Sequence, residues 1–193
     1  MKLYEAENLL LLKNTKYDTS YVFLSKDRII FLKEGITKEV ASELSALLLY
    51  YDNMSPTDDI SIYIHSNGGD GDALVQIYDV INMIRAPVKT ICLGKAFSAA
   101  AILLASGTKG KRYAYKNSKI MIHGIQFEFP IPGDDQVNSK NYFEFAKKNN
   151  DKLMKMLADS TGNDLNKVKE DCKRDLFLEP NEALKYGIID HVI

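Results

Sequence analysis

Three local patterns in the sequence place groups where covalent hydrolytic chemistry could take place. The first is Ser98, which follows Gly94 and Ala96 at a turn and begins an apolar helix predicted for 98–105. A hydroxyl at a strand-to-helix turn lies at the positive end of a helix, where backbone amides can support an anionic intermediate. Serine is also a favoured helix N-cap, and on its own the pattern more often indicates that structural role.

The second and third patterns each follow a predicted strand. Gly68 and Gly69 follow a strand predicted for 60–65, after Ser66 and Asn67. Glycine lets the backbone turn with positive φ and leaves N–H groups free to face a ligand, although most such pairs only form turns. His123 ends the apolar strand predicted for 120–123. Because α/β sheets bind ligands at the carboxyl ends of their strands, His123 is a candidate base, with a hydrogen-bonded core histidine as the alternative.

The elements that must position these groups alternate between strand and helix. Periodicity predicts strands over 28–32, 60–65, 88–93, 120–123 and 188–193, and helices over 37–51, 72–84, 98–105, 136–159 and 163–172. The polar stretch 107–118 is expected to be a loop. Strand–helix–strand units of this length predict an α/β domain with parallel pairing. The lysine-rich helix 136–159 follows a segment with two prolines and is expected to project from the core as an arm.

Composition narrows the class of protein. A chain of 193 residues with 46% hydrophobic and 26% charged residues predicts a single globular domain, 1–193. The net charge of −1 gives no reason to expect a nucleic-acid or membrane partner. Cys92 and Cys172 are isolated, so we expect no disulfide framework, no metal site and a reduced, cytoplasmic setting. No stretch approaches the roughly 20 apolar residues of a membrane span.

Four ordered segments resemble the proteolytic subunit of the Clp serine peptidases. TICLGKAFS (90–98) is similar to that family's nucleophile segment, and SGTKGKRYAYKNSKIMIH (106–123) to its histidine strand. IYIHSNGGDGDALVQIYD (62–79) resembles its oxyanion-hole strand and the helix after it. DCKRDLFLEPNEALKYGIIDHV (171–192) resembles its aspartate segment and closing strand. The resemblance covers about 23–192, and four motifs in order are far more specific than any one.

The resemblance implies a residue set and a chemistry. Ser98 would be the nucleophile, His123 its general base and Asp175 the group that orients the imidazole. The backbone N–H groups of Gly69 and Ala99 would form the oxyanion hole. The activity implied is that of a serine endopeptidase, which hydrolyses peptide bonds through an acyl-enzyme and needs no cofactor.

The resemblance also implies an architecture and an assembly. The family's fold is a spiral of strand–strand–helix turns, Clp- or crotonase-like, with a protruding helical handle. In this chain the head would span about 20–123 and 160–193, and the handle about 124–159. Family members form heptameric rings, stacked as a tetradecamer, which receive unfolded polypeptide substrates from an AAA+ unfoldase. The sequence has no GxxxxGK[ST] phosphate-binding motif, so ATP would be used only by that partner.

Departures from the family pattern suggest how the chain could differ. Ala99 stands where a methionine is common, which predicts a larger pocket beside Ser98. Asp70 and Asp72 replace apolar and hydroxyl residues, which predicts tolerance of basic substrate side chains. Lys173 replaces an acidic residue of the contacts between rings, and the segment after His123 is unlike the family's glycine-rich strand, so stacking is an open question.

Two alternative functions follow from these observations. A non-catalytic or conditionally active ring subunit is favoured by the altered handle and disfavoured by the complete residue set. A crotonase-like acyl-CoA enzyme would share the spiral fold and a glycine-based oxyanion hole, but it would not need Ser98, His123 and Asp175 together.

Overall fold

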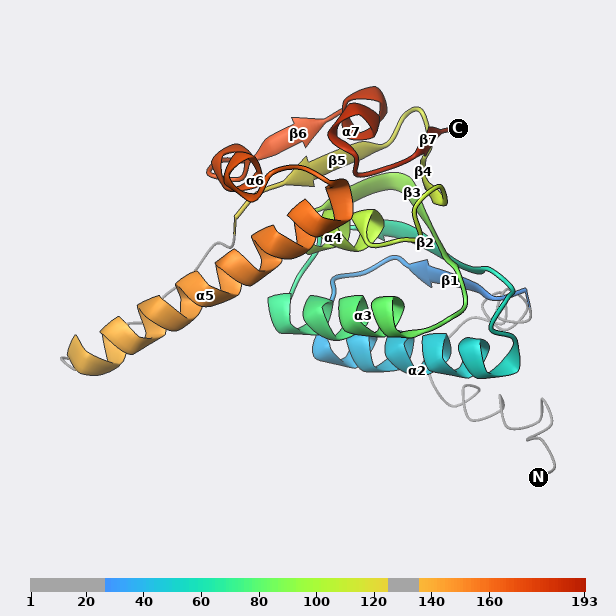
Figure 1. Ribbon diagram of the computed structural model, residues 1–193, viewed down its shortest axis with the longest axis horizontal. Helices are drawn as coiled ribbons and strands as arrows, with labels where there is room; N and C mark the ends of the chain where they lie inside the picture. The colour runs from blue at the N-terminus through green and yellow to red at the C-terminus, as the bar shows by residue number, and fades with distance from the viewer. Residues whose placement is uncertain (1–26, 125–135) are drawn as a thin grey trace.

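A computed structural model describes residues 27–124 and 136–193 of the chain, and the predicted proline-containing segment therefore lies outside the described residues. Within them, one seven-stranded sheet is accompanied by six helices (Figure 1). The strands are β1 Ile29–Leu32, β2 Ile60–Ser66, β3 Val88–Phe97, β4 Arg112–Ala114, β5 Lys119–Ile122, β6 Leu176–Leu178 and β7 His191–Val192. The helices are α2 Lys38–Met54, α3 Gly71–Met83, α4 Ala99–Ala105, α5 Gln136–Thr161, α6 Leu165–Asp171 and α7 Pro180–Tyr186.

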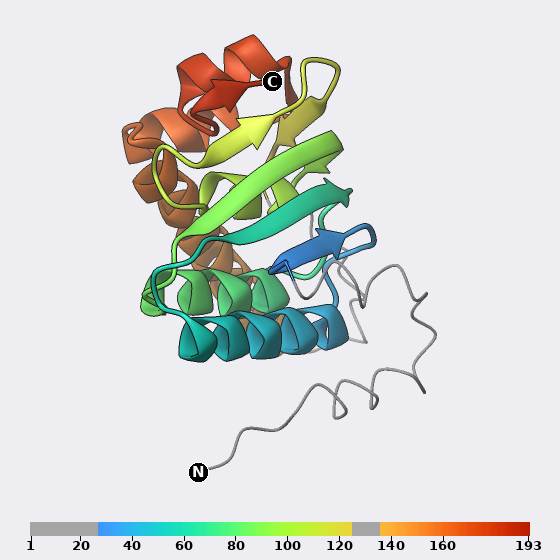
Figure 2. The ribbon, with the colours of Figure 1, turned by 90° about the vertical axis from the view of Figure 1, so that its right-hand side faces the viewer.

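The sheet is built on the long strand β3. Its strand order is β1-β2-β3-β4-β7, with every pair parallel, and the far end of β3 pairs with β5 instead of β4. The strand β6 then pairs with β5 in the antiparallel direction. Helices α2 and α3 lie side by side below the sheet (Figure 2). The predicted α/β class with parallel pairing is confirmed.

Local sequence explains where the helices begin. Thr37 precedes α2 and its hydroxyl accepts the N–H of Val40 at 3.3 Å, as predicted for an N-cap. Asp70 caps α3 in the same way, accepting the N–H of Ala73 at 2.9 Å. Every residue of α4 is buried, because this short helix of alanine, isoleucine and leucine lies in the centre of the core. The helix that begins after Ser98 is therefore held in place from all sides.

Four parts of the chain differ from the sequence-based prediction. The strand predicted over 188–193 is wrong in its first half, since only His191–Val192 pairs with the sheet as β7. The predicted loop 107–118 is wrong in its middle, where the short strand β4 pairs with β3 and β7. The strand predicted to end at 93 continues to Phe97, because Gly94 adopts φ 90° and lets β3 change partners. The short elements β6 and α7 were not predicted, since three and seven residues are too few to show a period.

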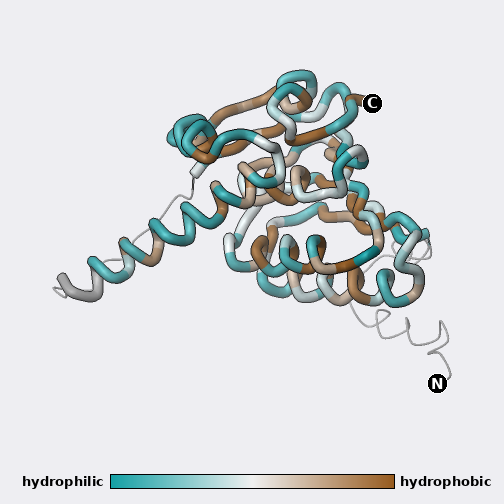
Figure 3. Tube along the Cα trace, viewed as in Figure 1, coloured by the Kyte–Doolittle hydropathy of each residue, from teal (hydrophilic) through white to brown (hydrophobic). Residues whose placement is uncertain are grey.

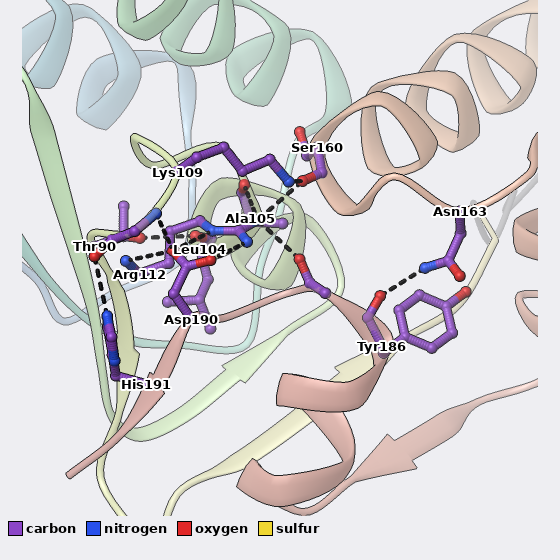
Figure 4. Close-up of polar contacts among 12 residues, drawn as sticks. Thr90, Leu104, Ala105, Lys109, Arg112, Ser160, Asn163, Tyr186, Asp190 and His191 are labelled. Atoms are coloured by element: carbon purple, nitrogen blue, oxygen red, sulfur yellow. Dashed lines mark hydrogen bonds and ion pairs between the residues drawn. The ribbon is translucent and has the colours of Figure 1, made fainter.

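A buried arginine joins the carboxyl-terminal part of the chain to the sheet (Figure 4). Arg112 binds the carboxylate of Asp190 through two nitrogens, at 2.8 and 2.5 Å. Its third nitrogen donates to the carbonyls at the ends of three helices, those of Ala105, Ser160 and Gly187. Lys109 also donates to the Ser160 carbonyl. We call this set the Arg112 centre.

Helix α5 is the longest element and has two different parts. Near its carboxyl end, Leu153, Met154 and Leu157 are buried in the core. The amino-terminal part extends away from the sheet (Figure 1) and is coloured mainly hydrophilic (Figure 3). In the described ranges 27–124 and 136–193, no helix is both long and apolar enough to span a membrane.

Candidate active site

Ser98 lies at the junction between β3 and α4 in an uncommon backbone conformation. Its φ of 56° and ψ of −125° are rare for a residue with a side chain. Ser98 occupies the N-cap position of α4, but its side chain makes no cap hydrogen bond. Instead Oγ lies 2.8 Å from Nε2 of His123. Ser98 is therefore the N-cap residue of α4 by position, but its hydroxyl contacts His123 and does not cap the helix.

His123 follows β5 and contacts both other members of the predicted set. Its Nδ1 lies 3.2 Å from Oδ1 of Asp175. Since a carboxylate only accepts hydrogen bonds, a neutral His123 carries its proton on Nδ1, and Nε2 is left to accept from the Ser98 hydroxyl. The antiparallel pairing of β5 with β6 places Asp175 here, because Ile122 faces Leu176 and each functional residue is one position further out.

The glycine pair packs directly against the backbone of Ser98. A Cβ atom on Gly68 would lie 2.6 Å from the Phe97 carbonyl oxygen and 2.9 Å from the Ala99 nitrogen. Gly68 also has a φ of 90°, so both space and conformation require glycine there. A Cβ on Gly69 would overlap the backbone of Ile36. The two glycines therefore allow three backbone segments to converge beside Ser98.

Two backbone N–H groups remain available at this convergence. The Gly68 carbonyl accepts the Ile36 N–H at 2.9 Å, and the Asp70 N–H donates to the Ile36 carbonyl at 2.8 Å. This pairing uses the groups on either side of Gly69 and leaves its own N–H directed elsewhere. Within 27–124 and 136–193, neither this N–H nor that of Ala99 has an acceptor.

Ser66 supports the glycine turn and was not identified from the sequence. Its side chain is buried, and Oγ donates to the Glu34 carbonyl at 2.7 Å while accepting the Gly68 N–H at 3.1 Å. The signal that could have identified it is a serine two positions before a glycine, because serine side chains commonly bond to the backbone two residues on.

A cavity of about 370 Å³ opens beside Ser98. The predicted site residues Ser98, Ala99, Gly69 and His123 all line it, together with Asp70, Gly71, Asp72, Val75, Ile102, Asn149, Lys152, Leu153 and Met154. A pocket therefore lies beside Ala99, and its enlargement by alanine in place of methionine stays a prediction. A second cavity, of about 450 Å³, lies on the Asp175 side of His123.

The two cysteines are poor candidates for the nucleophile. Burial raises the pKa of Cys92 to about 11, and burial together with the nearby Asp171 carboxylate raises the pKa of Cys172 to about 12. The thiolate is the reactive form, so both side chains are unreactive near neutral pH. Among the described residues, no group of three or more His, Cys, Asp or Glu side chains is arranged to hold a metal ion.

The arrangement of a serine, a histidine and an aspartate in line, beside two free N–H groups, suits acyl transfer to a hydroxyl.

A comparison with models of known protein families identifies the chain independently of this geometry. The model for the Clp protease family matches residues 12–193, which is nearly the whole chain. This protein belongs to the Clp protease family, a family of peptidases.

Proposed function

We propose that this chain is a serine endopeptidase in which Ser98 is the nucleophile, His123 the general base and acid, and Asp175 the orienting carboxylate. The observation that supports it most is the line of contacts from Ser98 Oγ to His123 Nε2 at 2.8 Å and from Nδ1 to Asp175 at 3.2 Å. These distances are those of a nucleophile with its base and of a base with its orienting group.

The reaction has two halves. In the first, Ser98 Oγ attacks the carbonyl carbon of the scissile peptide while its proton moves to Nε2 of His123. The imidazolium, held by the Asp175 carboxylate, then donates this proton to the leaving amine as the C–N bond breaks. In the second half, water loses a proton to Nε2 and attacks the ester, and Ser98 recovers its proton as the carboxylic acid product leaves.

Charge develops on the carbonyl oxygen in both halves. The N–H groups of Gly69 and Ala99 are proposed to bind this oxyanion, since neither has another acceptor among the described residues. Ser98 adopts a positive φ, and the N–H of the next residue belongs to the first residue of α4. Rigid packing of α4 and Gly68 keeps these donors in place before the substrate arrives, which is the condition for this kind of stabilisation.

The assembly and partners are part of the same proposal and are supported by the family relationship. We propose heptameric rings, stacked as a tetradecamer, that enclose the active sites and receive unfolded polypeptides from an ATP-dependent AAA+ unfoldase in the cytoplasm. The head would span about 20–123 and 160–193, and the handle about 124–159. The peptidase itself would need no cofactor.

The proposed chemistry is tested by labelling the full-length protein with a fluorophosphonate, followed by intact-mass analysis and peptide mapping. We expect one label per chain, located on Ser98 and absent from Ser98→Ala. Peptide hydrolysis by the same preparation should disappear with that substitution. A label elsewhere would assign a different nucleophile. An assembled protein that takes no label and cleaves no peptide would favour a subunit without catalytic activity, and turnover of acyl-CoA thioesters instead of peptides would favour the crotonase-like alternative.

A further inference from the structure

The cavity beside Ser98 combines apolar walls with a charged rim. Its walls are formed by Val75, Ile102, Leu153 and Met154, the last three almost fully buried. Gly71 lies so close to the wall that a Cβ there would be 3.3 Å from Leu153 Cδ1. Walls of this kind fit a side chain with a long aliphatic stem.

The two carboxylates at the rim are not equivalent. Asp70 is the N-cap of α3, and its Oδ1 is bound to the Ala73 N–H at 2.9 Å. This contact holds the Asp70 carboxylate at the start of the helix. Asp72 is exposed in the first turn of α3 and makes no hydrogen bond or ion pair within the described ranges. Asp70 keeps its negative charge but has one oxygen held by the helix, whereas Asp72 has both oxygens available at the rim.

A cation lies across the same cavity. Lys152 lines it from α5 and is exposed. Other lysines of this region form ion pairs, as Lys155 does with Asp159 at 2.9 Å and Lys169 with Asp151 at 2.6 Å. Lys152 forms none with the part of the chain that the structure describes, and it is not bridged to Asp72. Asp72 and Lys152 therefore give the cavity an acceptor and a donor that do not satisfy each other, beside the other polar lining residues Asp70 and Asn149.

Such a rim distinguishes substrate side chains by charge and by hydrogen bonding. A lysine or arginine side chain is attracted by Asp72 and repelled by Lys152, and a glutamate experiences the reverse. A neutral amide carries a donor and an acceptor on one carbon and can satisfy both groups. The sequence-based prediction that basic substrate side chains are tolerated considered Asp70 and Asp72 but not Lys152.

We propose that this cavity binds the substrate side chain on the acyl side of the scissile bond, the P1 side chain, and that Asp72 and Lys152 select an unbranched neutral amide there. Glutamine fits this description best. The inference rests on the proposed serine peptidase function, because it places the P1 side chain by reference to Ser98 and the N–H groups of Gly69 and Ala99.

The test is a set of peptides that differ only at P1, which is glutamine, glutamate, lysine or methionine. Glutamate is isosteric with glutamine, and methionine has a similar unbranched length without the amide. We expect kcat/KM for glutamine to exceed those for glutamate and lysine by about fivefold, as for charges at a solvent-accessible rim, and to be at least equal to that for methionine. Equal rates for glutamine, glutamate and lysine would overturn the proposal, and so would a clear preference for methionine.

Two substitutions test which residues set this order. Asp72→Asn should raise the glutamate-to-glutamine ratio, and Lys152→Gln should raise the lysine-to-glutamine ratio, each about fivefold. Matched controls are Asp79→Asn, an exposed aspartate further along α3, and Lys148→Gln, one turn before Lys152 on α5. These should leave both ratios unchanged. Ratios that do not respond to either rim substitution would overturn the assignment.

The outcome can be separated from that of the proposed function. Labelling of Ser98 with cleavage of the methionine peptide, but without the expected order among the other three, would overturn only the selectivity. If Ser98 takes no label and none of the four peptides is cleaved, both proposals fail.

Discussion

The Arg112 centre and the Ser98 site contain similar groups but differ in how far those groups are exposed to solvent. Each joins a nitrogen-containing side chain to a carboxylate, Arg112 to Asp190 and His123 to Asp175. The side chains of the first pair are 3% and 18% exposed, and those of the second are 15% and 47% exposed. The Arg112 centre is closed, and the Ser98 site opens to a cavity.

The two regions also differ in how completely their hydrogen bonds are satisfied. Arg112 donates to one carboxylate and to three carbonyls that end helices. At the Ser98 site, two N–H groups lack acceptors within 27–124 and 136–193, and Ser98 has a strained backbone. A satisfied buried network stabilises one arrangement of helices, while unsatisfied donors held by a rigid frame are ready for a substrate. We therefore expect substitutions in one region to affect stability and those in the other to affect activity.

The largest expected effect is on catalysis by His123→Ala. Without the base, kcat/KM for a peptide should fall about 10⁴- to 10⁶-fold, as for members of other catalytic triads. The thermal midpoint should change little, since the side chain is not part of the hydrophobic core. Peptide kinetics and thermal unfolding of the same preparation measure both. His191→Ala is the control, because His191 lies on β7 away from the Ser98 site. Among the described residues its side chain hydrogen-bonds to the Gly110 carbonyl and stacks on the ring of Tyr113. Substantial peptidase activity in His123→Ala would contradict the distinction between the two regions.

Arg112→Met should have the opposite profile. It leaves the Asp190 carboxylate without its ion-pair partner and removes one donor from each of three helix-end carbonyls, so it should lower the free energy of unfolding by about 3–5 kcal/mol. Denaturant unfolding measures the loss. The control is Arg85→Met, which removes an exposed partner of Asp52 and should cost under about 1 kcal/mol. The double variant Arg112→Met with Asp190→Leu should recover part of the loss, because no charge is then left unpaired. A single variant as stable as the wild type would show that this centre does not hold the helices together.

The Ser98 site could be predicted from the sequence far better than the Arg112 centre. Ser98, His123 and Asp175 each lie in a segment that resembles the Clp family's, and the structure brings the three together. Nothing local marks Arg112, which lies in a stretch predicted to be a loop. Its partners at Ala105, Ser160 and Gly187 are backbone carbonyls, which every residue has. Contacts from a side chain to distant backbone carbonyls depend on tertiary packing, so no side-chain pattern in the sequence predicts them.

The strands and helices also differ in how well the sequence predicts them, for the same reason. The long strands and helices were predicted within a few residues, because a long element repeats its hydrophobic period several times. The strand β4 has three residues in a polar stretch, and it forms only because β3 and β7 provide partners on both sides. The orientation of Lys152 toward the Ser98 cavity also depends on where α5 crosses the core, which periodicity does not specify.

Asp190→Asn sharpens the comparison through pH. Burial alone would raise the pKa of Asp190, but the hydrogen bonds and charge of Arg112 outweigh it and lower the pKa below its ordinary value of 3.8. A carboxyl group with a lowered pKa in the folded state stabilises the protein above its unfolded pKa, and this contribution is lost as pH falls through the folded pKa. We expect Asp190→Asn to cost about 1–3 kcal/mol at neutral pH. The difference from the wild type should shrink below pH 4. Unfolding free energies across this range measure it, and a difference independent of pH would mean that the charge of Asp190 is not what stabilises the centre.

The smallest expected effect comes from enlarging an alanine at each end of α4. Ala99 is buried but lines the Ser98 cavity, so the side chain of Ala99→Met can enter that cavity and should cost little stability. It should lower kcat/KM for a peptide with a long P1 side chain about fivefold relative to one with alanine at P1, because the added atoms occupy the subsite. Ala105→Met has no such space, since Ala105 is buried where its carbonyl meets Arg112, and overpacking there should cost about 1–3 kcal/mol of stability. Replacing alanine by methionine would therefore make the substrate pocket smaller at the amino end of α4 and destabilise the fold at its carboxyl end. Equal losses of stability in the two variants would mean that the cavity beside Ser98 does not accept a side chain, which would remove its role as the P1 subsite.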